Sequence, residues 1–269
     1  MPKISVIMGI YNCEKYINES IDSILNQTLS DWELIMCDDG SKDQTYTIAK
    51  YYADKYPEKI KIIKNSKNRG LNYTLNKCLK RASGEYIARQ DADDRSKSDR
   101  LRIEYEFLES NPEYALVSAN MELFDEKGKW GKTNFSGEVT KHDLAKGSPF
   151  MHPVVMMRRK ELISIGGYSI SERLLRVEDY HLWFKFYIHG YKGFNLSDAL
   201  YEYRDNREAF AKRTVKQRYH TFRLMLWGLR KLKIKKIWYI YSVKQLCLLL
   251  TPSELYAYLH KLKWSLNNK

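Results

Sequence analysis

Three aspartates, Asp91, Asp93 and Asp94, lie within four positions in the segment Arg89-Gln90-Asp91-Ala92-Asp93-Asp94, which directly follows the apolar stretch Tyr86-Ile87-Ala88. Closely spaced carboxylates repel one another, so an ordered loop that carries them needs a cation, and alternate residues such as Asp91 and Asp93 can converge on one ion. We expect Mg²⁺ or Mn²⁺, because both prefer oxygen ligands and leave coordination positions open for a diphosphate. The cluster therefore predicts a nucleotide-diphosphate site. On these residues alone, a solvated acidic turn before a helix near Ser98 is the alternative.

A second pair of acids, Asp38 and Asp39, follows the apolar run Trp32–Cys37 and precedes Gly40-Ser41. A buried strand that ends in acids and a glycine is typical of the crevice at the carboxyl ends of a parallel sheet, where α/β folds bind nucleotides. An acid placed there can accept hydrogen bonds from a base or a ribose. The same residues also form a common turn and helix-start signature, which is the simpler interpretation of this motif alone.

The elements that must position these acids alternate along the first 90 residues. Helical spacing predicts helices over 16–25, Thr45–Tyr56 and Leu71–Ala82. Apolar runs predict strands over Ile4–Ile10, Trp32–Cys37, Ile60–Ile63 and Glu85–Arg89. Such alternation predicts an α/β fold with a mostly parallel sheet covered by helices on both faces, so both acid clusters would open onto one edge.

The pattern becomes irregular after Ser98. We expect a helix over Arg100–Ser110, strands over Ala115–Phe124 and Val154–Met157, and a turn at 125–129. A further acid pair, Glu178-Asp179, lies in the first turn of a predicted helix, where its charge could simply complement the helix dipole.

Composition indicates a folded chain whose basic charge is concentrated near its end. The 269 residues are 43% hydrophobic and 13% aromatic, enough for one large α/β domain and an appendage. The net charge of +13 comes from residues 204–269, with 16 basic and 3 acidic residues, whereas residues 1–203 carry 30 of each. We therefore expect two parts, 1–203 and a basic amphipathic helical extension over 204–269.

Cysteine spacing and the N-terminal residues indicate in which cellular compartment the protein lies. Cys13, Cys37, Cys78 and Cys247 form no C-x-x-C pair, so we expect reduced thiols in the cytoplasm. The first apolar run, Ile4–Ile10, is too short for a signal peptide, so we expect no export.

Six motifs in the same order and spacing resemble the family 2 glycosyltransferases, inverting nucleotide-sugar enzymes of the GT-A (Rossmann-like) fold. The resemblance covers residues 4–203. Its motifs are Ser5-Val6-Ile7-Met8-Gly9-Ile10-Tyr11-Asn12, Asp38-Asp39-Gly40-Ser41, Asn68-Arg69-Gly70-Leu71, Gly84-Glu85-Tyr86-Ile87-Ala88, Asp91-Ala92-Asp93-Asp94 and Glu178-Asp179.

The resemblance implies roles for the acids. Asp38 or Asp39 would contact the uracil and ribose, Asp91 would face the ribose, and Asp93 would ligate the metal that bridges the diphosphate. An inverting transfer needs one base for the acceptor hydroxyl and no enzyme nucleophile. Asp179 is the expected base by similarity to the family's Glu-Asp motif, with Glu178 as the second candidate.

Five further residues are candidates with open alternatives. His152 could ligate the metal or lie over the diphosphate, or it could be a hydrogen-bonding residue of its proline-bounded loop. Arg69 and Arg89 could bind phosphate oxygens, or be solvated. Tyr11 and Asn12 could contact the base or ribose, or fill the core.

The basic segment 212–250 mixes Lys and Arg with Leu, Ile, Trp and Tyr. This pattern is typical of a segment that lies in the headgroup region of an anionic membrane, and its most apolar stretch, 237–250, is too short to span one. A basic bundle that packs on the catalytic domain is the alternative. Membrane location fits family members that extend polyprenyl-diphosphate-linked glycans for capsule or O-antigen at the cytoplasmic face of the bacterial cell membrane.

The sequence thus predicts transfer of a hexose or N-acetylhexosamine from a UDP-sugar to a lipid-linked glycan, forming a β-linkage. Two other classes are less consistent with it. A nucleic-acid-binding protein would show a recognition motif, and none is present, so we expect no nucleic acid partner. A nucleotidyltransferase would carry a glycine-rich triphosphate loop after the first strand, where this chain has Tyr11-Asn12-Cys13-Glu14.

Overall fold

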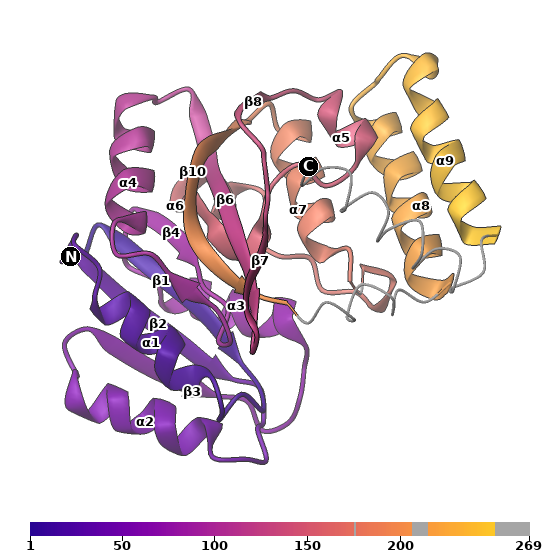
Figure 1. Ribbon diagram of the computed structural model, residues 1–269. Helices are drawn as coiled ribbons and strands as arrows, with labels where there is room; N and C mark the ends of the chain where they lie inside the picture. The colour runs from indigo at the N-terminus through magenta and orange to yellow at the C-terminus, as the bar shows by residue number, and fades with distance from the viewer. Residues whose placement is uncertain (175, 206–214, 251–269) are drawn as a thin grey trace.

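Ten strands form one mixed sheet in the computed structural model, which describes residues 1–174, 176–205 and 215–250 (Figure 1). The main order is β3-β2-β1-β4-β9-β6-β10-β5, with β7 paired to β6 and β8 paired to β10. The strands are β1 (Ile4–Ile10), β2 (Trp32–Asp38), β3 (Ile60–Lys64), β4 (Tyr86–Arg89), β5 (Arg95–Ser96), β6 (Tyr114–Asp125), β7 (Gly128–Lys132), β8 (Gly137–Val139), β9 (Val155–Arg158) and β10 (Lys192–Arg204).

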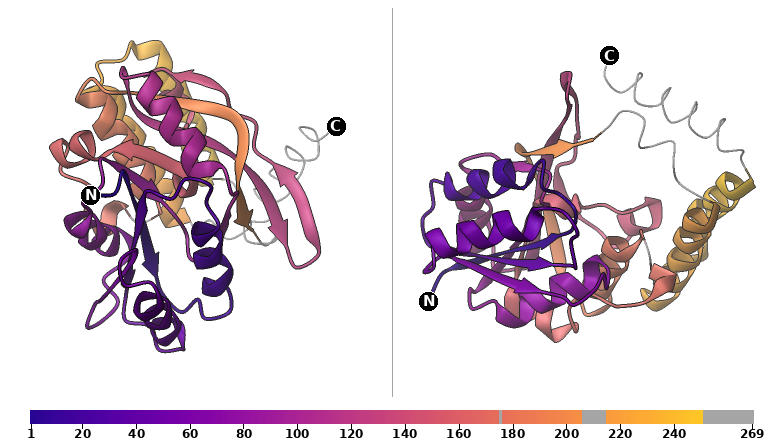
Figure 2. Two further views of the ribbon diagram at one scale, coloured as in Figure 1. Left: turned by 90° about the vertical axis from the view of Figure 1, so that its left-hand side faces the viewer. Right: turned by 90° about the horizontal axis from the view of Figure 1, so that it is seen from below.

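Helices cover both faces of the sheet (Figure 2). Apolar side chains of α1, α2 and α4 pack on one face, and those of α3, α6, α7 and α8 on the other. The α-helices are α1 (Ile17–Leu25), α2 (Thr45–Lys55), α3 (Leu71–Arg81), α4 (Arg100–Ser110), α5 (Asp143–Lys146), α6 (Arg159–Ser164), α7 (Glu178–Ile188), α8 (Val215–Lys231) and α9 (Ile240–Leu250). Short 3₁₀ turns are η1 (His152–Val154), η2 (Glu172–Leu174) and η4 (Lys236–Tyr239).

The predicted α/β sheet with helices on both faces is confirmed, and the strands β1 to β4 pair in parallel as expected. The C-terminal half of the sheet is more mixed than its first half, because β9 runs antiparallel between β4 and β6. Past β4 the chain also makes a β6–β7 hairpin, which replaces the regular strand-helix alternation by local antiparallel pairing.

A buried carboxylate fixes the strands that carry the acid loops. Glu33 on β2 accepts hydrogen bonds from the Ser5 hydroxyl (2.7 Å) and from Ser83 N–H and Oγ (2.8 and 2.7 Å), and Lys61 Nζ lies 2.6 Å from it. A Cβ added to Gly84 would lie 2.6 Å from the Ser5 nitrogen, so only glycine lets β4 start this close to β1.

The basic extension divides into two differently packed helices. α8 packs on α7, and a Cβ at Gly228 would lie 2.3 Å from the Phe184 ring, so this contact requires a glycine. α9 packs on α8, and both views place the pair at the end of the molecule away from α2 (Figures 1 and 2). No helix in the described ranges is long and apolar enough to cross a membrane.

Parts of the predicted extension lie outside the described residues. These are 206–214, which includes Lys212 and Arg213, residues 251–269, and the side chains of residues 245 and 247–250, among them Cys247. The division into 1–203 and 204–269 therefore stays a prediction, with β10 ending at Arg204.

Candidate active site

Three loops meet where β1, β2 and β4 end. In register, Ile10 of β1 pairs with Asp38 of β2, and Ile7 pairs with Arg89 of β4. Because these strands are parallel, the segments that follow them leave the sheet at the same edge. The structure thus brings together the predicted residues of all three strand ends.

Asp38 and Asp39 are buried and shape the neighbouring loops. Asp38 accepts the N–H groups of Gly40 and Ser41 at 3.2 and 3.3 Å. Asp39 accepts the N–H groups of Arg69 and Gly70, both at 2.8 Å, and the Asn65 side-chain amide at 2.8 Å. Both carboxylates are therefore engaged with backbone groups. Their direct contact with a base or ribose stays a prediction.

Asn12 links the first loop to the second. Its N–H donates to the Ser41 hydroxyl (3.1 Å), and its Oδ1 accepts the N–H of Lys42 (3.0 Å). Asn12 has φ 47°, a left-handed conformation that asparagine tolerates better than most residues. The neighbouring Tyr11 is 45% exposed, so its ring is available to a ligand. Arg69 is also exposed, with its guanidinium 4.8 Å from the centre of the Tyr73 ring.

A buried amide holds the loop of aspartates in place. Gln90 is fully buried, and its Nε2 donates to the carbonyls of Asp91 and Asp94 at 3.2 and 3.1 Å. The Asp91 N–H donates to the hydroxyl of Tyr201 on β10 (3.0 Å), and its carbonyl accepts the Ser20 hydroxyl of α1 (2.7 Å). The loop is thus fixed by the adjacent Gln90 and by two elements distant in sequence, α1 and β10.

Arg89 lies under this loop and pairs with Asp91. Its side chain is 3% exposed, and its two terminal nitrogens lie 2.5 and 2.9 Å from the two Asp91 oxygens. The fork geometry restricts the Asp91 carboxylate to one orientation. Arg89 therefore acts on the site through Asp91, and direct phosphate binding by Arg89 stays a prediction.

Asp93 and Asp94 differ in exposure. The Asp93 side chain reaches solvent, yet the enclosing loop and the charge of Asp91 raise its pKa to about 6. Asp94 is fully buried, and burial together with Asp91 and Asp93 raises its pKa well above the ordinary value. The Arg204 N–H donates to Asp94 Oδ1 (2.7 Å), while the Arg204 guanidinium donates to the Asp93 carbonyl (2.9 Å).

These residues fit a divalent ion. The charges of Asp91 and Asp93 repel each other, and a bound cation would reduce this repulsion. Mg²⁺ or Mn²⁺ needs only one or two protein carboxylates when substrate phosphates and water complete its coordination shell. Within the described ranges, no group of three or more His, Cys, Asp or Glu side chains could hold a metal by itself.

His152 occupies the wall of the site. It is buried, and its Nε2 lies 3.1 Å from the Tyr168 hydroxyl. Burial, with a smaller effect of Arg89, lowers the pKa of His152 well below the ordinary value, so the imidazole is neutral. This geometry fits the hydrogen-bonding alternative for His152, and metal ligation by it stays a prediction.

Tyr168 connects the two halves of the site. Its hydroxyl is buried, which raises its pKa; the charge of Arg89 opposes this rise and the charges of Asp91 and Asp179 add to it. Its hydroxyl contacts His152, which the proline-bounded loop carries.

Asp179 is oriented by a serine. The Ser148 hydroxyl donates to Asp179 Oδ2 (3.2 Å) and accepts the Trp183 indole N–H (3.1 Å). Burial, followed by the charge of Asp179, raises the pKa of the neighbouring Glu178, whose Oε2 is buried without a hydrogen bond. The two carboxylates at the start of α7 therefore have different environments.

Sequence reasoning missed Tyr201, Arg204, Tyr168 and Ser148. The first two lie on β10, which no clear alternation predicts, and Tyr168 and Ser148 lie in irregular segments. The sequence offered one signal for Ser148, because it lies in the same proline-bounded loop, 147–153, as the candidate His152.

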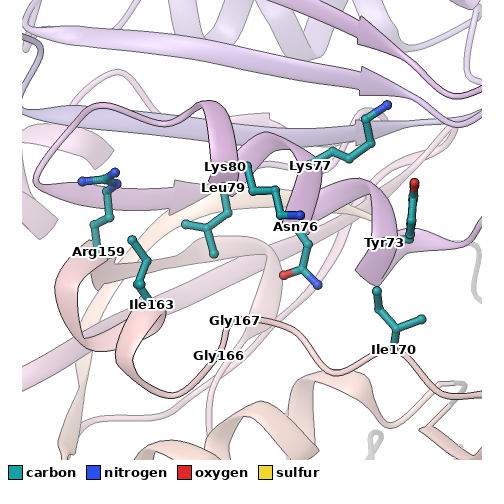
Figure 3. A pocket seen from close by; sticks show the side chains of 10 residues that line it. All are labelled: Tyr73, Asn76, Lys77, Leu79, Lys80, Arg159, Ile163, Gly166, Gly167 and Ile170. Atoms are coloured by element: carbon teal, nitrogen blue, oxygen red, sulfur yellow. The ribbon is translucent and has the colours of Figure 1, made fainter.

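A cavity of about 520 Å³ lies elsewhere, between α3 and the segment 159–170 (Figure 3). None of the predicted site residues lines it. The Gly167 backbone approaches Asn76 and Leu79 of α3 there, and Lys77 and Lys80 lie along its rim. We assign this cavity no part in the chemistry.

Comparison of the sequence with known proteins finds one matching family model and several relatives. The family model described as glycosyl transferase family 2 matches residues 5–166. EpsE of Bacillus subtilis (strain 168), which is named as a glycosyltransferase, is 42% identical over 260 residues, 97% of this chain and 94% of that protein. An Escherichia coli UDP-Gal:alpha-D-GlcNAc-diphosphoundecaprenol beta-1,3-galactosyltransferase is 29% identical over 82% of this chain and 84% of that protein.

A solved structure shares the fold. Residues 1–349 of S. aureus TarS in complex with UDP match with a TM-score of 0.66 at 24% identity, over 92% of this chain and 70% of that chain.

Proposed function

Because the chain belongs to glycosyltransferase family 2 and is a transferase, we propose that it moves a hexose or N-acetylhexosamine from a UDP-sugar to a hydroxyl group of a lipid-linked glycan. The observation that carries this proposal is the convergence of the acid loops at the ends of β1, β2 and β4, where Arg89 and Tyr201 hold the Asp91–Asp93 loop. A similar protein from Escherichia coli is named for a UDP-sugar donor and a diphosphoundecaprenol-linked acceptor.

The donor binds at the strand ends. Tyr11 packs against the base, while Asn12, Asp38 and Asp39 hold the loops that surround the nucleoside. Asp91, oriented by Arg89, accepts a ribose hydroxyl. Arg69 lies on the exposed side of the third loop, within reach of the phosphates.

Asp91 and Asp93 would hold Mn²⁺ or Mg²⁺ together with the diphosphate. Bound there, such an ion supplies positive charge that offsets the charge developing on the leaving nucleoside diphosphate. Asp93 is the direct ligand in this proposal, and Arg204 keeps its loop in place from β10.

Asp179 is the general base. It takes the proton of the acceptor hydroxyl as that oxygen attacks the anomeric carbon and the bond from that carbon to the phosphate oxygen breaks. One in-line displacement inverts the configuration, so an α-linked donor gives a β-linked product. Ser148 orients the Asp179 carboxylate for this step. Glu178 is the second candidate for the base.

An exposed apolar stripe suits α9 to an anionic membrane surface. Ile240, Val243 and Leu246 are 64%, 53% and 43% exposed, and their spacing of three places them on one side of α9. Ile237, 72% exposed, precedes them in η4. Lysines flank the stripe at 233, 235, 236 and 244. Trp227 and Trp238, by contrast, stack on His181 and His142 of the catalytic part. The membrane role therefore falls to α9, and α8 packs as in the alternative expectation.

A transfer assay tests the proposal. Purified protein is incubated with Mn²⁺, each of UDP-glucose, UDP-galactose and their N-acetyl derivatives, and an N-acetylglucosamine-diphosphate-alkyl acceptor. We expect one donor to be consumed, a β-linked disaccharide by NMR, and loss of transfer in EDTA. An α-linked product would contradict inversion. Failure with every UDP-sugar while a GDP- or dTDP-sugar is consumed would contradict the donor class.

A further inference from the structure

A second cavity, of about 270 Å³, lies between η2, α7 and α8. Its lining contains cationic, imidazole and apolar side chains and no carboxylate: Ser171, Arg173, Leu174, His181, His220, Arg223, Leu224 and Trp227. A volume near the lower end of the range for ligand pockets suits a group the size of a diphosphate rather than a whole oligosaccharide.

Two guanidinium groups give the cavity its charge. Arg173 and Arg223 are exposed, and neither forms an ion pair with a carboxylate among the residues that the structure describes. Arg223 lies 5.7 Å from the centre of the Tyr219 ring, which limits the directions its fork can take. Planar guanidinium groups bind phosphate oxygens with paired hydrogen bonds, so the cavity favours an anion with several oxygens.

The Nδ1 atoms of two imidazoles in the lining have no hydrogen-bond partner among the residues that the structure describes. His220 is 9% exposed, and its Nδ1 makes no hydrogen bond. His181 stacks on Trp227, with 4.8 Å between ring centroids, and its Nδ1 also has no partner. Burial lowers the pKa of His181 to about 4, so this ring is neutral and offers a donor or an acceptor without charge. Buried polar atoms without partners are uncommon, which points to a polar ligand.

The position of the cavity connects the transfer site with the proposed membrane face. His181 lies two residues after Asp179 on α7, and α8, which forms the opposite wall, packs against α9 with its apolar stripe. Leu174, Leu224 and Trp227 add an apolar wall to the cationic one. An amphiphile with an anionic head and an apolar chain matches both the cationic wall and the apolar wall.

We infer that this cavity binds the diphosphate of the lipid-linked acceptor, with Arg173 and Arg223 on the phosphate oxygens and the apolar wall against the first part of the lipid chain. This inference rests on the proposed function, because it assigns a site to the acceptor of that reaction. It locates the acceptor's phosphates apart from the donor's, which lie at the Asp91–Asp93 loop.

Binding without turnover provides the first test. Farnesyl diphosphate is titrated calorimetrically into the full chain, with inorganic pyrophosphate and farnesol as partial ligands. We expect Arg173→Gln and Arg223→Gln each to weaken farnesyl diphosphate about tenfold, the effect of one lost charge-assisted hydrogen bond. Arg230→Gln, an exposed arginine of α8 outside the cavity, is the matched control and should change nothing. Unchanged affinity in both variants, or pyrophosphate binding as tightly as farnesyl diphosphate, would overturn the inference.

Kinetics provide the second test. In Arg223→Gln, KM should rise about tenfold for an N-acetylglucosamine-diphosphate-alkyl acceptor at unchanged kcat, with no change for the alkyl glycoside that lacks phosphate. Equal changes for both acceptors would indicate a structural effect and overturn the assignment. Titrations of the wild type separate the two proposals. Wild-type protein that binds UDP but not farnesyl diphosphate contradicts the cavity assignment alone, whereas wild-type protein that does not bind UDP contradicts the proposed donor site.

Discussion

The guanidinium of Arg89 holds both carboxylate oxygens of Asp91, with N–O distances of 2.5 and 2.9 Å. The two residues are separated by one position at the end of β4, and the arginine is buried whereas Asp91 faces the site edge. The pair therefore fixes the direction of one acid of the proposed donor site before any ligand binds.

Removing this arginine should weaken both folding and donor binding. In Arg89→Met, Asp91 loses its partner, so we expect the free energy of unfolding to fall by about 3 kcal/mol and UDP affinity to fall at least about tenfold. Urea unfolding and UDP titration measure the two effects. Arg81→Met, at the exposed end of α3, is the control. If Arg89→Met binds UDP like the wild type, Asp91 needs no orientation by Arg89.

The proposed base should act on turnover without affecting donor binding. Asp179→Asn removes the proton acceptor, so we expect kcat to fall about 10³-fold while UDP affinity is unchanged. Ser148→Ala keeps the carboxylate and loses only its orienting hydrogen bond, so a fall of about tenfold is expected. Single-turnover rates measure both. A larger loss in Glu178→Gln than in Asp179→Asn would transfer the role to Glu178.

Glu33 should make stability dependent on pH. Burial alone would raise its pKa, but hydrogen bonds from Lys61, Ser83 and Ser5 outweigh burial and lower the pKa to about 2. Since the folded value lies below the unfolded value, the stabilisation is complete above about pH 4.5 and is lost as pH falls toward 2. Glu33→Gln should therefore lower the free energy of unfolding by about 3 kcal/mol at pH 7.

Urea unfolding of the wild type and Glu33→Gln between pH 3 and 7 measures this effect. The difference between them should shrink as pH falls below about 4.5. Exposed Glu58→Gln is the control, with little difference at any pH. A difference independent of pH would show that Glu33 contributes by shape and hydrogen bonding rather than by its charge.

The α9 stripe should bind anionic vesicles. Ile240→Asp with Val243→Asp places charge in the apolar stripe, so partitioning onto vesicles that contain phosphatidylglycerol should fall at least about tenfold. Ile163→Asp on α6 replaces an isoleucine that is 48% exposed but distant in sequence from the stripe, and should bind as the wild type does. Wild-type protein that does not bind vesicles containing phosphatidylglycerol would contradict the membrane proposal.

The first half of the fold could be predicted because its signals are local. Ile4–Ile10 and Arg100–Ser110 match their predicted bounds, and the other predicted strands and helices up to Arg89 differ by a residue or so at their ends. Parallel strands buried on both faces read as continuous apolar runs, and this is why they stand out in the sequence.

β10 was not predicted, because its sequence contains no continuous apolar run and no regular alternation. Its polar residues Asn195, Ser197 and Asp198 interrupt any alternation, and its pairing with β6 contains register shifts. The contacts it supplies, from Tyr201 and Arg204 to the acid loop, span about 110 positions and are visible only in the folded chain.

Within the site, charged residues were easier to find than their partners. The acids that open the strand-end loops were identified, but for Arg89 the sequence offered phosphate binding or solvation and not its pairing with Asp91. Its burial rules out the solvated alternative, and phosphate binding stays a prediction. Alternate residues of an extended segment point to one side, so a pair at positions 89 and 91 was the available signal. Asp38 bonds the N–H groups of Gly40 and Ser41, as the turn interpretation of this motif expects, whereas the bonds from Asp39 to the N–H groups of Arg69 and Gly70 were not predicted.

Calorimetric titration of UDP with Mn²⁺, with EDTA, and in Asp93→Asn tests the donor site most directly. We expect binding in Mn²⁺ that EDTA or Asp93→Asn weakens at least about tenfold, because the carboxylate and the diphosphate share the ion. Asp99→Asn, an acid just before α4 and outside the loop, should bind as the wild type does. Binding of UDP that is equally tight in EDTA and in Asp93→Asn would contradict a metal-bridged donor site at this loop.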